Sequence, residues 1–270
     1  ENVRNEGPRP GQVLQLTGCH VKVLIAHGDA ASRDRLCRIT EDDGALGLSY
    51  VLLGGILPPL SGEVLLGGER PLRRMKRKEI ARHIAIVPQN GGVYHYQTVF
   101  QFAIQGRSPH LSLLGFESPA DEQIALEALE MTQLTRYSRS RVTEISGGER
   151  QRLLLARALA QQTEILLLDE FTANLDINYQ VELLRLVQRI TRERNLATLI
   201  VSHEINLLGA FCDTVVLMSQ GAIRRQGTVH EVLTRENLKD IFGLDFTIRL
   251  NPDGNVEVLP VIPRDSALCN

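Results

Sequence analysis

From about residue 120 onward, helical periodicity alternates with short runs of unbroken apolar residues. The run 165–168 ends in Asp169-Glu170 and is typical of a strand buried on both faces of a sheet. A second buried strand is predicted at 197–202. Amphipathic helices are predicted at 121–134, 149–161 and 179–194. Helices that alternate with buried strands predict an α/β fold with a mostly parallel sheet.

Turn-forming residues divide the rest of the chain. Gly221 separates the apolar runs 214–220 and 223–226, which predicts a β-hairpin, and helical signals return at 229–242. The turn at 251–254, Asn-Pro-Asp-Gly, separates two further predicted strands, 246–250 and 256–259. Upstream, a strand is predicted at 21–26. The stretch from about Thr98 to Ala160 is almost wholly helical and is predicted to form a helical subdomain.

The composition excludes some classes of function. A chain of 270 residues with 43% hydrophobic residues can bury a full core, and a net charge of −2 gives no bulk attraction to nucleic acid or anionic lipid. The four cysteines form no CxxC pair and fit a reducing compartment. Neither a membrane-spanning stretch nor a signal-peptide pattern is visible, so we expect a soluble protein whose membrane role comes through a partner.

One of the predicted helices opens with the residues Ile-Ser-Gly-Gly-Glu-Arg-Gln-Arg, 145–152. Gly147 and Gly148 leave backbone N–H groups free at the positive end of the helix dipole, where phosphate binds well. The Ser146 hydroxyl can add a further donor. Taken alone, Ser-Gly-Gly before a helix is more often a simple cap.

Polar residues also follow three apolar stretches. Asp169 and Glu170 end one strand, His203 follows the next, and Gln89 follows the stretch at 86–88. Ligands bind at the carboxyl ends of parallel strands, where one carboxylate can hold Mg²⁺ while its neighbour orients an attacking water. In isolation, each of these residues also fits an acidic turn or a structural histidine.

In order and spacing, these elements resemble the ATP-binding cassette (ABC) family over about three quarters of the chain, from about Leu57 to Leu259. The motifs that carry the resemblance are the Q-loop (87–89), the signature motif (146–151), the Walker B strand (165–169), the catalytic glutamate (Glu170), the D-loop (173–176) and the switch histidine (His203). Phe171 departs from the family, which usually has Pro there. Finer resemblance, at 57–64, 106–110, 115–119 and 174–178, is to importers of iron–siderophore, haem or cobalamin.

The resemblance implies a single ABC ATPase domain over 1–270 with a P-loop NTPase-like, RecA-like α/β fold. Its mostly parallel sheet core, with N-terminal strands, is expected at 10–97 and 161–243. The inserted helical signature subdomain is expected at 98–160, and a short β-rich C-terminal extension at 244–270.

The resemblance also implies roles for individual residues. Asp169 and Gln89 would bind Mg²⁺, Glu170 would act as general base for water, and His203 would sense the γ-phosphate. Gln89 would also link the site to a permease. The residues expected to hold ATP bound by a partner subunit, or to contact that subunit, are Ser146, Gly147, Gly148, Gln151 and Asp176.

The partners implied are transmembrane permease subunits, a second ABC ATPase subunit in a homo- or heterodimer, and indirectly a substrate-binding protein, with no nucleic acid. ATP hydrolysis would drive import from the cytoplasmic face of the membrane, where the chain would be peripheral through the permease.

The family's phosphate-binding loop, Gly-x-x-x-x-Gly-Lys-Ser/Thr, is missing from its expected place. The sequence has no Gly-Lys pair. Counting back from Leu57 places the loop near 42–48, where Leu stands in place of the cation, and a second alignment places it at 27–32. Residues 1–49 also lack an aromatic residue to stack on adenine. The anomaly lies within Cys19 to Ser49, which fits a frame shift or a local replacement better than gradual decay.

Three hypotheses follow. The chain is an importer ATPase with a local defect that weakens or abolishes its own binding of MgATP. Alternatively, it is a non-catalytic ABC-fold subunit that docks to a permease or to an intact paralogue. A non-transport ABC protein acting on nucleic acid is least favoured, because such proteins usually carry two cassettes or long coiled-coil insertions.

Overall fold

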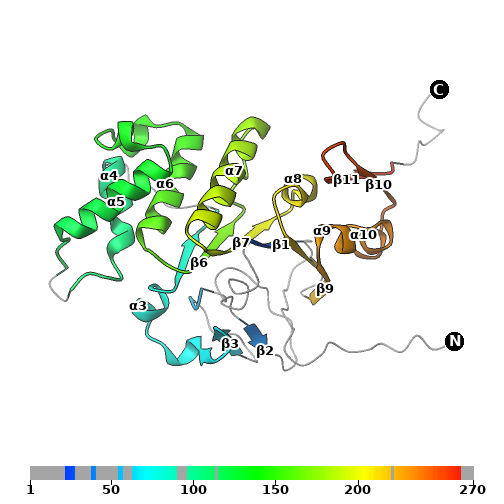
Figure 1. The fold of residues 1–270 in the computed structure, drawn as a ribbon, viewed down its shortest axis with the longest axis horizontal. Helices are drawn as coiled ribbons and strands as arrows, with labels where there is room; N and C mark the ends of the chain where they lie inside the picture. The colour runs from blue at the N-terminus through cyan, green and yellow to red at the C-terminus, as the bar shows by residue number, and fades with distance from the viewer. Residues whose placement is uncertain are drawn as a thin grey trace.

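The computed structural model describes residues 22–27, 38–40, 54–56, 63–89, 96–112, 115–219 and 222–262. A central sheet has the strand order β5-β6-β7-β1-β8-β9 (Figure 1). The bounds of these strands are β5 Ile84–Val87, β6 Ile165–Asp169, β7 Ala197–Ser202, β1 Lys22–His27, β8 Thr214–Ser219 and β9 Ala222–Gly227. β5, β6 and β7 run parallel, and β8 and β9 form the predicted hairpin. The α/β fold is confirmed, and its parallel part is β5, β6 and β7. The pairings of β1 with β7 and β8, and of β8 with β9, are antiparallel, which differs from the predicted mostly parallel sheet.

The helices follow the sequence pattern closely. Their bounds are α3 Arg77–Ile80, α4 Val99–Ile104, α5 Pro119–Met131, α6 Gly147–Ala160, α7 Ile177–Glu193, α8 Ile205–Gly209, α9 Val229–Val232 and α10 Arg235–Phe242, with short 3₁₀ helices at η1 Leu72–Arg74, η2 Gln105–Arg107, η3 Thr135–Tyr137 and η4 Val142–Glu144. The helical signal predicted at 229–242 is split between α9 and α10. Thr234 causes the break, because its side chain caps α10 by accepting the Asn237 N–H.

Two smaller sheets complete the described part of the chain. β2 (Arg38–Thr40), β3 (Glu63–Leu66) and β4 (Arg70–Pro71) form an antiparallel sheet. β10 (Phe246–Leu250) and β11 (Val256–Pro260) form the second predicted hairpin. Asn206 of α8 fastens this hairpin, since its side-chain amide donates to the Val258 carbonyl at 2.9 Å and accepts the Val258 N–H at 2.7 Å.

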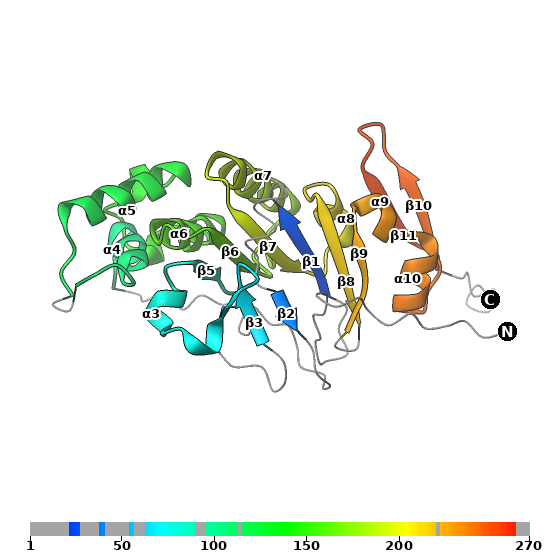
Figure 2. The same ribbon diagram turned by 60° about the horizontal axis from the view of Figure 1, so that its bottom comes forward.

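The central sheet separates two apolar layers, which explains the unbroken apolar runs in its strands. Leu166 and Leu168 of β6 pack into the layer that includes α4, α5, α6 and α7. Ile165 and Leu167 pack into the opposite layer, beside α3 and β3. Figure 2 shows α5, α6 and α7 on one side of the sheet and β2, β3 and α3 on the other. Because successive side chains in a strand point to opposite faces, a strand covered on both faces needs apolar residues at every position.

The direction of β1 bears on one of the two placements of the phosphate loop. β1 is antiparallel to both β7 and β8, with Val23 beside Ser202 and His27 beside Thr198. A strand that leads into a phosphate loop should end at the ligand-binding edge of the sheet, where β6 and β7 end. His27 lies at the opposite edge, which does not favour the placement at 27–32, and residues 28–32 lie outside the described residues. The placement near 42–48 lies outside the described residues.

Helices α4, α5 and α6 lie within the stretch 98–160 that was predicted to be helical, and each begins with a capping box. The side chains of Thr98, Ser118 and Ser146 each accept the N–H of the residue three positions later, and that residue's side chain reaches back to the cap. These reciprocal bonds satisfy N–H groups that a helix start leaves unpaired. Within the described ranges, none of the helices combines the length and apolar character needed to cross a membrane.

Candidate functional site

The parallel strands bring four predicted site residues to one edge of the sheet. Val87 is paired with Leu168, and Asp169 with Val201, so β5, β6 and β7 end side by side. Glu170 and His203 directly follow the ends of β6 and β7, and Gln89 lies two residues after the end of β5. The Glu170 N–H donates to the Val201 carbonyl at 2.8 Å, which fixes the start of this loop against β7.

The Glu170 carboxylate lies between an amide and an imidazole. Gln89 Nε2 donates to one carboxylate oxygen at 2.5 Å, and His203 Nδ1 lies 3.9 Å from the other. Glu170 has a φ of +44°, a conformation that residues with a side chain rarely adopt. The His203 side chain is 63% exposed, so it can meet a ligand from solvent. This geometry holds a carboxylate in one orientation at the sheet edge.

Asp169 occupies the last position of β6 and is buried. Carboxylate and amide oxygens, such as those of Asp169, Glu170 and Gln89 at this edge, are donors that Mg²⁺ prefers. In the described ranges, no group of three or more His, Cys, Asp or Glu side chains could hold a metal ion by itself. A magnesium ion here would therefore also need oxygens from water and from phosphate, as is usual for Mg²⁺ in nucleotide sites.

The start of α6 presents an open glycine. Ser146 is the N-cap and its hydroxyl accepts the Glu149 N–H at 3.3 Å. A Cβ added at Gly147 would meet no other described atom within 4 Å. A phosphate could therefore approach the backbone at this position, at the positive end of the helix dipole. The residues present fit an anionic group.

Glu149 is a site residue that sequence reasoning missed. Its carboxylate accepts from the Ser146 N–H at 2.8 Å and from the Ser146 hydroxyl at 2.9 Å. A hydrogen bond from the Tyr137 side chain is the main cause of a lowered Glu149 pKa, so the carboxylate is held ionised beside Ser146. The spacing Ser-x-x-Glu is the capping-box signal that would have found it.

Gln151, also predicted to hold the partner's nucleotide, has a buried side-chain oxygen. Its Oε1 has no hydrogen-bond partner in the described part of the chain. Its role with nucleotide stays a prediction.

Gly148 lies under an aromatic ring. A Cβ added there would be 2.9 Å from the Cδ1 atom of Tyr179, which is 47% exposed. We expect Gly148→Ala to lower the free energy of unfolding by about 1 kcal/mol, because overpacking outweighs the helix propensity of Ala. In a Tyr179→Ala background the same change should raise stability by about 0.5–1 kcal/mol. Urea unfolding of the four proteins of this cycle measures the coupling, and additive effects would show that the ring does not restrict this position.

The D-loop is tied to the segment that carries His203. Asp176 caps α7 by accepting the N–H groups of Asn178 and Tyr179, both at 3.2 Å. Gln180, a buried residue that sequence reasoning missed, donates to the Thr172 carbonyl at 3.1 Å and to Glu204 at 3.0 Å. Through Gln180, a movement of the loop before α7 would therefore be transmitted to Glu204, the residue next to His203.

Phe171 stands where the family usually has Pro, and the structure explains its apolar character. The side chain is 1% exposed and belongs to the apolar layer on the helical side of the sheet. The ring adds packed volume directly behind Glu170, so the departure from the family pattern is compatible with the geometry of the site.

Comparison with known proteins gives consistent results. The sequence profile of the ABC transporter family matches residues 49–173. The iron(3+)-hydroxamate import ATP-binding protein of Bacillus subtilis (strain 168) is 37% identical over 214 residues, which is 78% of this chain and 79% of that protein. The cobalamin import ATP-binding protein of Halobacterium salinarum is 33% identical over 94% of this chain, which spans 65% of that relative's length.

A solved structure supports the same family relationship as the sequence comparisons. A metal-chelate type ABC transporter in an inward-facing conformation matches with a TM-score of 0.66 and 27% identity, over 79% of this chain and 81% of the other. The strand order, the residues at the sheet edge and these relatives all lead to one assignment. The chain belongs to the ABC transporter family, in the branch of its iron–siderophore and cobalamin relatives.

Proposed function

We propose that the chain is an ATP-binding subunit of an importer whose cargo is of the iron–siderophore or cobalamin type. The observation that carries the proposal is the Glu170 carboxylate, which Gln89 holds at 2.5 Å and His203 flanks at 3.9 Å, at the carboxyl edge of the sheet. The relatives named as hydroxamate and cobalamin import ATP-binding proteins support the cargo class. The chain would act at the cytoplasmic face of the membrane, held there by permease subunits.

Each residue of the site would have one task. Asp169 and Gln89 would hold Mg²⁺, which when bound to the phosphates offsets their negative charge. Glu170 would accept the proton of the attacking water, since its carboxylate is fixed from both sides. His203 would contact the γ-phosphate from its exposed position. A fixed carboxylate and preset donors avoid reorganisation during the reaction.

The proposal includes a second ABC ATPase subunit. The start of α6, with Ser146, Gly147 and Gly148, would cover the nucleotide of that partner, and Asp176 would lie at the contact. A substrate-binding protein would act indirectly, through the permease. We also propose the division of the chain into a core (10–97 and 161–243), a helical subdomain (98–160) and an extension (244–270).

The chain's own nucleotide binding is proposed to be weak. The match to the family's sequence profile begins at residue 49, after the segment that lacks Gly-Lys-Ser/Thr, although the cobalamin relative aligns over 94% of the chain. The direction of β1 is also opposite to that of a strand leading into a phosphate loop. These two observations favour a second candidate function, a subunit that does not hold ATP itself. In such a subunit, α6 would cover the nucleotide bound by an intact partner.

Calorimetry of MgATP with the purified Glu170→Gln chain tests the proposal, because this variant cannot turn over bound nucleotide. We expect no binding tighter than about 1 mM. Binding in the micromolar range would show that the chain has a complete phosphate site and would remove the second candidate.

ATP hydrolysis by a mixture of this chain and an intact ABC ATPase subunit tests the second candidate function. If α6 serves a partner's nucleotide, hydrolysis by the mixture should fall by about 100-fold or more with Ser146→Ala in this chain, because one transition-state donor is lost. Arg139→Met, at an exposed position of the same subdomain, serves as the control that should leave the rate unchanged.

A further inference from the structure

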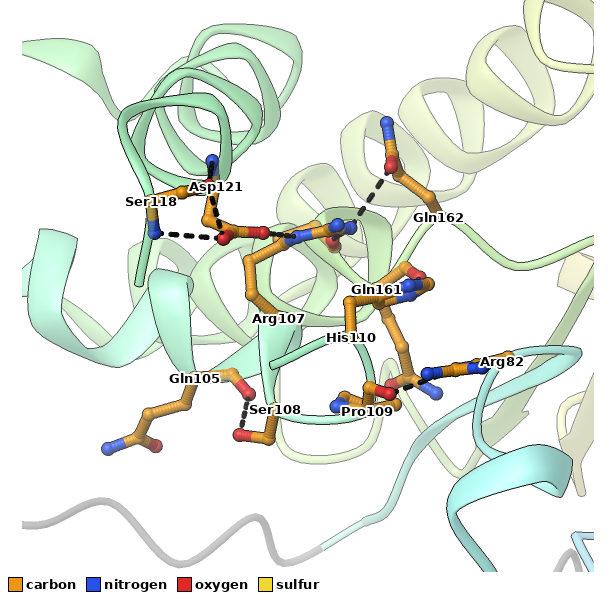
Figure 3. Close-up of polar contacts among 11 residues, drawn as sticks. Arg82, Gln105, Arg107, Ser108, Pro109, His110, Ser118, Asp121, Gln161 and Gln162 are labelled. Atoms are coloured by element: carbon orange, nitrogen blue, oxygen red, sulfur yellow. Dashed lines mark hydrogen bonds and ion pairs between the residues drawn. The ribbon is translucent and has the colours of Figure 1, made fainter. Parts of the chain in front are cut away.

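The stretch 106–110, Gly-Arg-Ser-Pro-His, packs against the last turn of α6 (Figure 3). Gly106 lies so close to α6 that a Cβ there would overlap the Arg157 backbone oxygen. Only glycine allows this approach, because the obstacle is helical backbone and cannot move aside. The contact brings Arg107 and His110 to the end of the helix, where carbonyl groups lack partners within the helix.

Arg107 joins the end of α6 to the start of α5. The residue is 6% exposed. Its Nε donates to Asp121 at 2.8 Å, and its Nη1 donates to the Ala160 carbonyl at 2.9 Å and to Gln162 at 3.0 Å. We call Arg107, Asp121, Ala160 and Gln162 the clamp. A planar guanidinium suits this task, since its rigid fork of donors can reach several acceptors at once.

Further hydrogen bonds hold Asp121 and the residues next to the clamp. Asp121 accepts from the Ser118 hydroxyl at 2.7 Å and from the Ser118 N–H at 3.0 Å, as Figure 3 shows. On the other side, His110 Nε2 donates to the Gln161 carbonyl at 2.8 Å, and Arg82 Nε donates to the Pro109 carbonyl at 3.0 Å. Because Arg82 lies between α3 and β5, the stretch 106–110 touches the sheet side as well as α5 and α6.

We propose that Arg107 is a positioning residue for α6, and that the clamp sets the angle at which this helix leaves the sheet. The opposite end of α6 carries Ser146, Gly147 and Gly148. A helix of 14 residues is about 20 Å long, so a tilt of about 10° at the clamp moves the other end by about 3–4 Å. Displacements of about 1 Å already reduce catalysis strongly. The importance of this angle for nucleotide rests on the proposed function.

The two stretches that connect through the clamp, 106–110 and 115–119, are both among those that resemble the importer branch. Gly106 and Arg107 come from the first, and Ser118, which caps α5 and binds Asp121, comes from the second. The clamp therefore assigns a structural role to the stretches 106–110 and 115–119, which contribute no residue to the nucleotide site.

The test measures the angle of α6 directly and needs no nucleotide. Spin labels are placed at the exposed positions Arg150 (start of α6) and Glu236 (α10), by substitution to Cys in a chain whose four natural cysteines are replaced. Pulsed electron spin resonance gives the distance distribution. We expect one narrow distribution, which Arg107→Met shifts or broadens by about 3–4 Å and Arg107→Lys brings back toward the original distance.

Two controls separate positioning from a general loss of stability. The label pair Arg192 and Glu236 lies outside 98–160 and should keep its distance in every variant. Arg139→Met removes an exposed arginine of the same subdomain and should leave both distances unchanged. If Arg107→Met does not fold, Asp121→Asn serves instead, because it leaves the bonds of Arg107 to Ala160 and Gln162 in place. An unchanged distance between Arg150 and Glu236 in a folded clamp variant overturns the proposal, whatever the chain does with ATP.

Discussion

Replacing Arg107 by Met is expected to lower the free energy of unfolding by about 3–5 kcal/mol, the cost of removing one partner from a buried ion pair. The two side chains of the pair are 7% and 14% exposed, so water cannot replace the lost contact. Asp121 would keep a charge with fewer donors, and the Ala160 carbonyl at the end of α6 would lose its donor. Urea unfolding followed by circular dichroism measures the change. A loss below about 1 kcal/mol, the range of exposed pairs, would contradict it.

Unfolding at acidic pH reports the ionisation of Asp121. The hydrogen bonds from the Ser118 side chain and backbone, together with Arg107, lower the pKa of Asp121 from 3.8 to about 2. A carboxyl whose pKa is lower in the folded state stabilises the protein above its unfolded value, and that contribution is lost as pH falls toward the folded value. The stability difference between the natural chain and Asp121→Asn should therefore be full above pH 4 and shrink by about pH 2.

Phe171→Ala is expected to cost about 3–5 kcal/mol, since it removes a ring from a packed core and leaves a cavity. Phe171 is 1% exposed and lies in the apolar layer that also holds Leu168 and Leu183. Phe171→Leu keeps most of the volume and should cost less than about 1.5 kcal/mol. Thermal and urea unfolding measure both variants.

Phe116 offers a matched control for this prediction. It is 77% exposed, so Phe116→Ala should change stability by no more than about 0.5 kcal/mol. Equal losses for the two Phe→Ala variants would mean that Phe171 does not have the buried packing described. A loss at Phe171 alone would show that the departure from the family's Pro has become part of the core.

The arrangement of the sheet edge was predictable because it depends on local patterns. Apolar runs at 165–168 and 197–202 marked strands covered on both faces, and parallel strands must end at a common edge. The positions of Asp169, Glu170 and His203 beside one another follow from these two facts. The helix starts predicted at 121 and 149 lie two residues after the observed starts, Pro119 and Gly147. The caps Ser118 and Ser146, each three positions before an acidic residue, are the signal that marks the observed starts.

Other features depend on pairings between distant segments, for which a single sequence holds no signal. Nothing in the local pattern at Arg107 shows that it will be buried against Asp121, or that Gln180 will donate to Glu204. The direction of β1 could not be predicted for the same reason. An apolar run predicts a strand, but the neighbours of a strand and its sense of travel are decided by the whole sheet.

The position of β1 also bears on aggregation. β1 is paired along one side with β7 and along the other with β8, so its six residues, Lys22–His27, cover backbone groups on two other strands. Unpaired strand edges are templates for joining to other chains. If this short segment were cut away or failed to pair, β7 and β8 would become two further edges, both rich in apolar residues, beside the existing edges β5 and β9. We therefore expect the solubility of the cassette during expression to depend on a segment that contributes no residue to the candidate site.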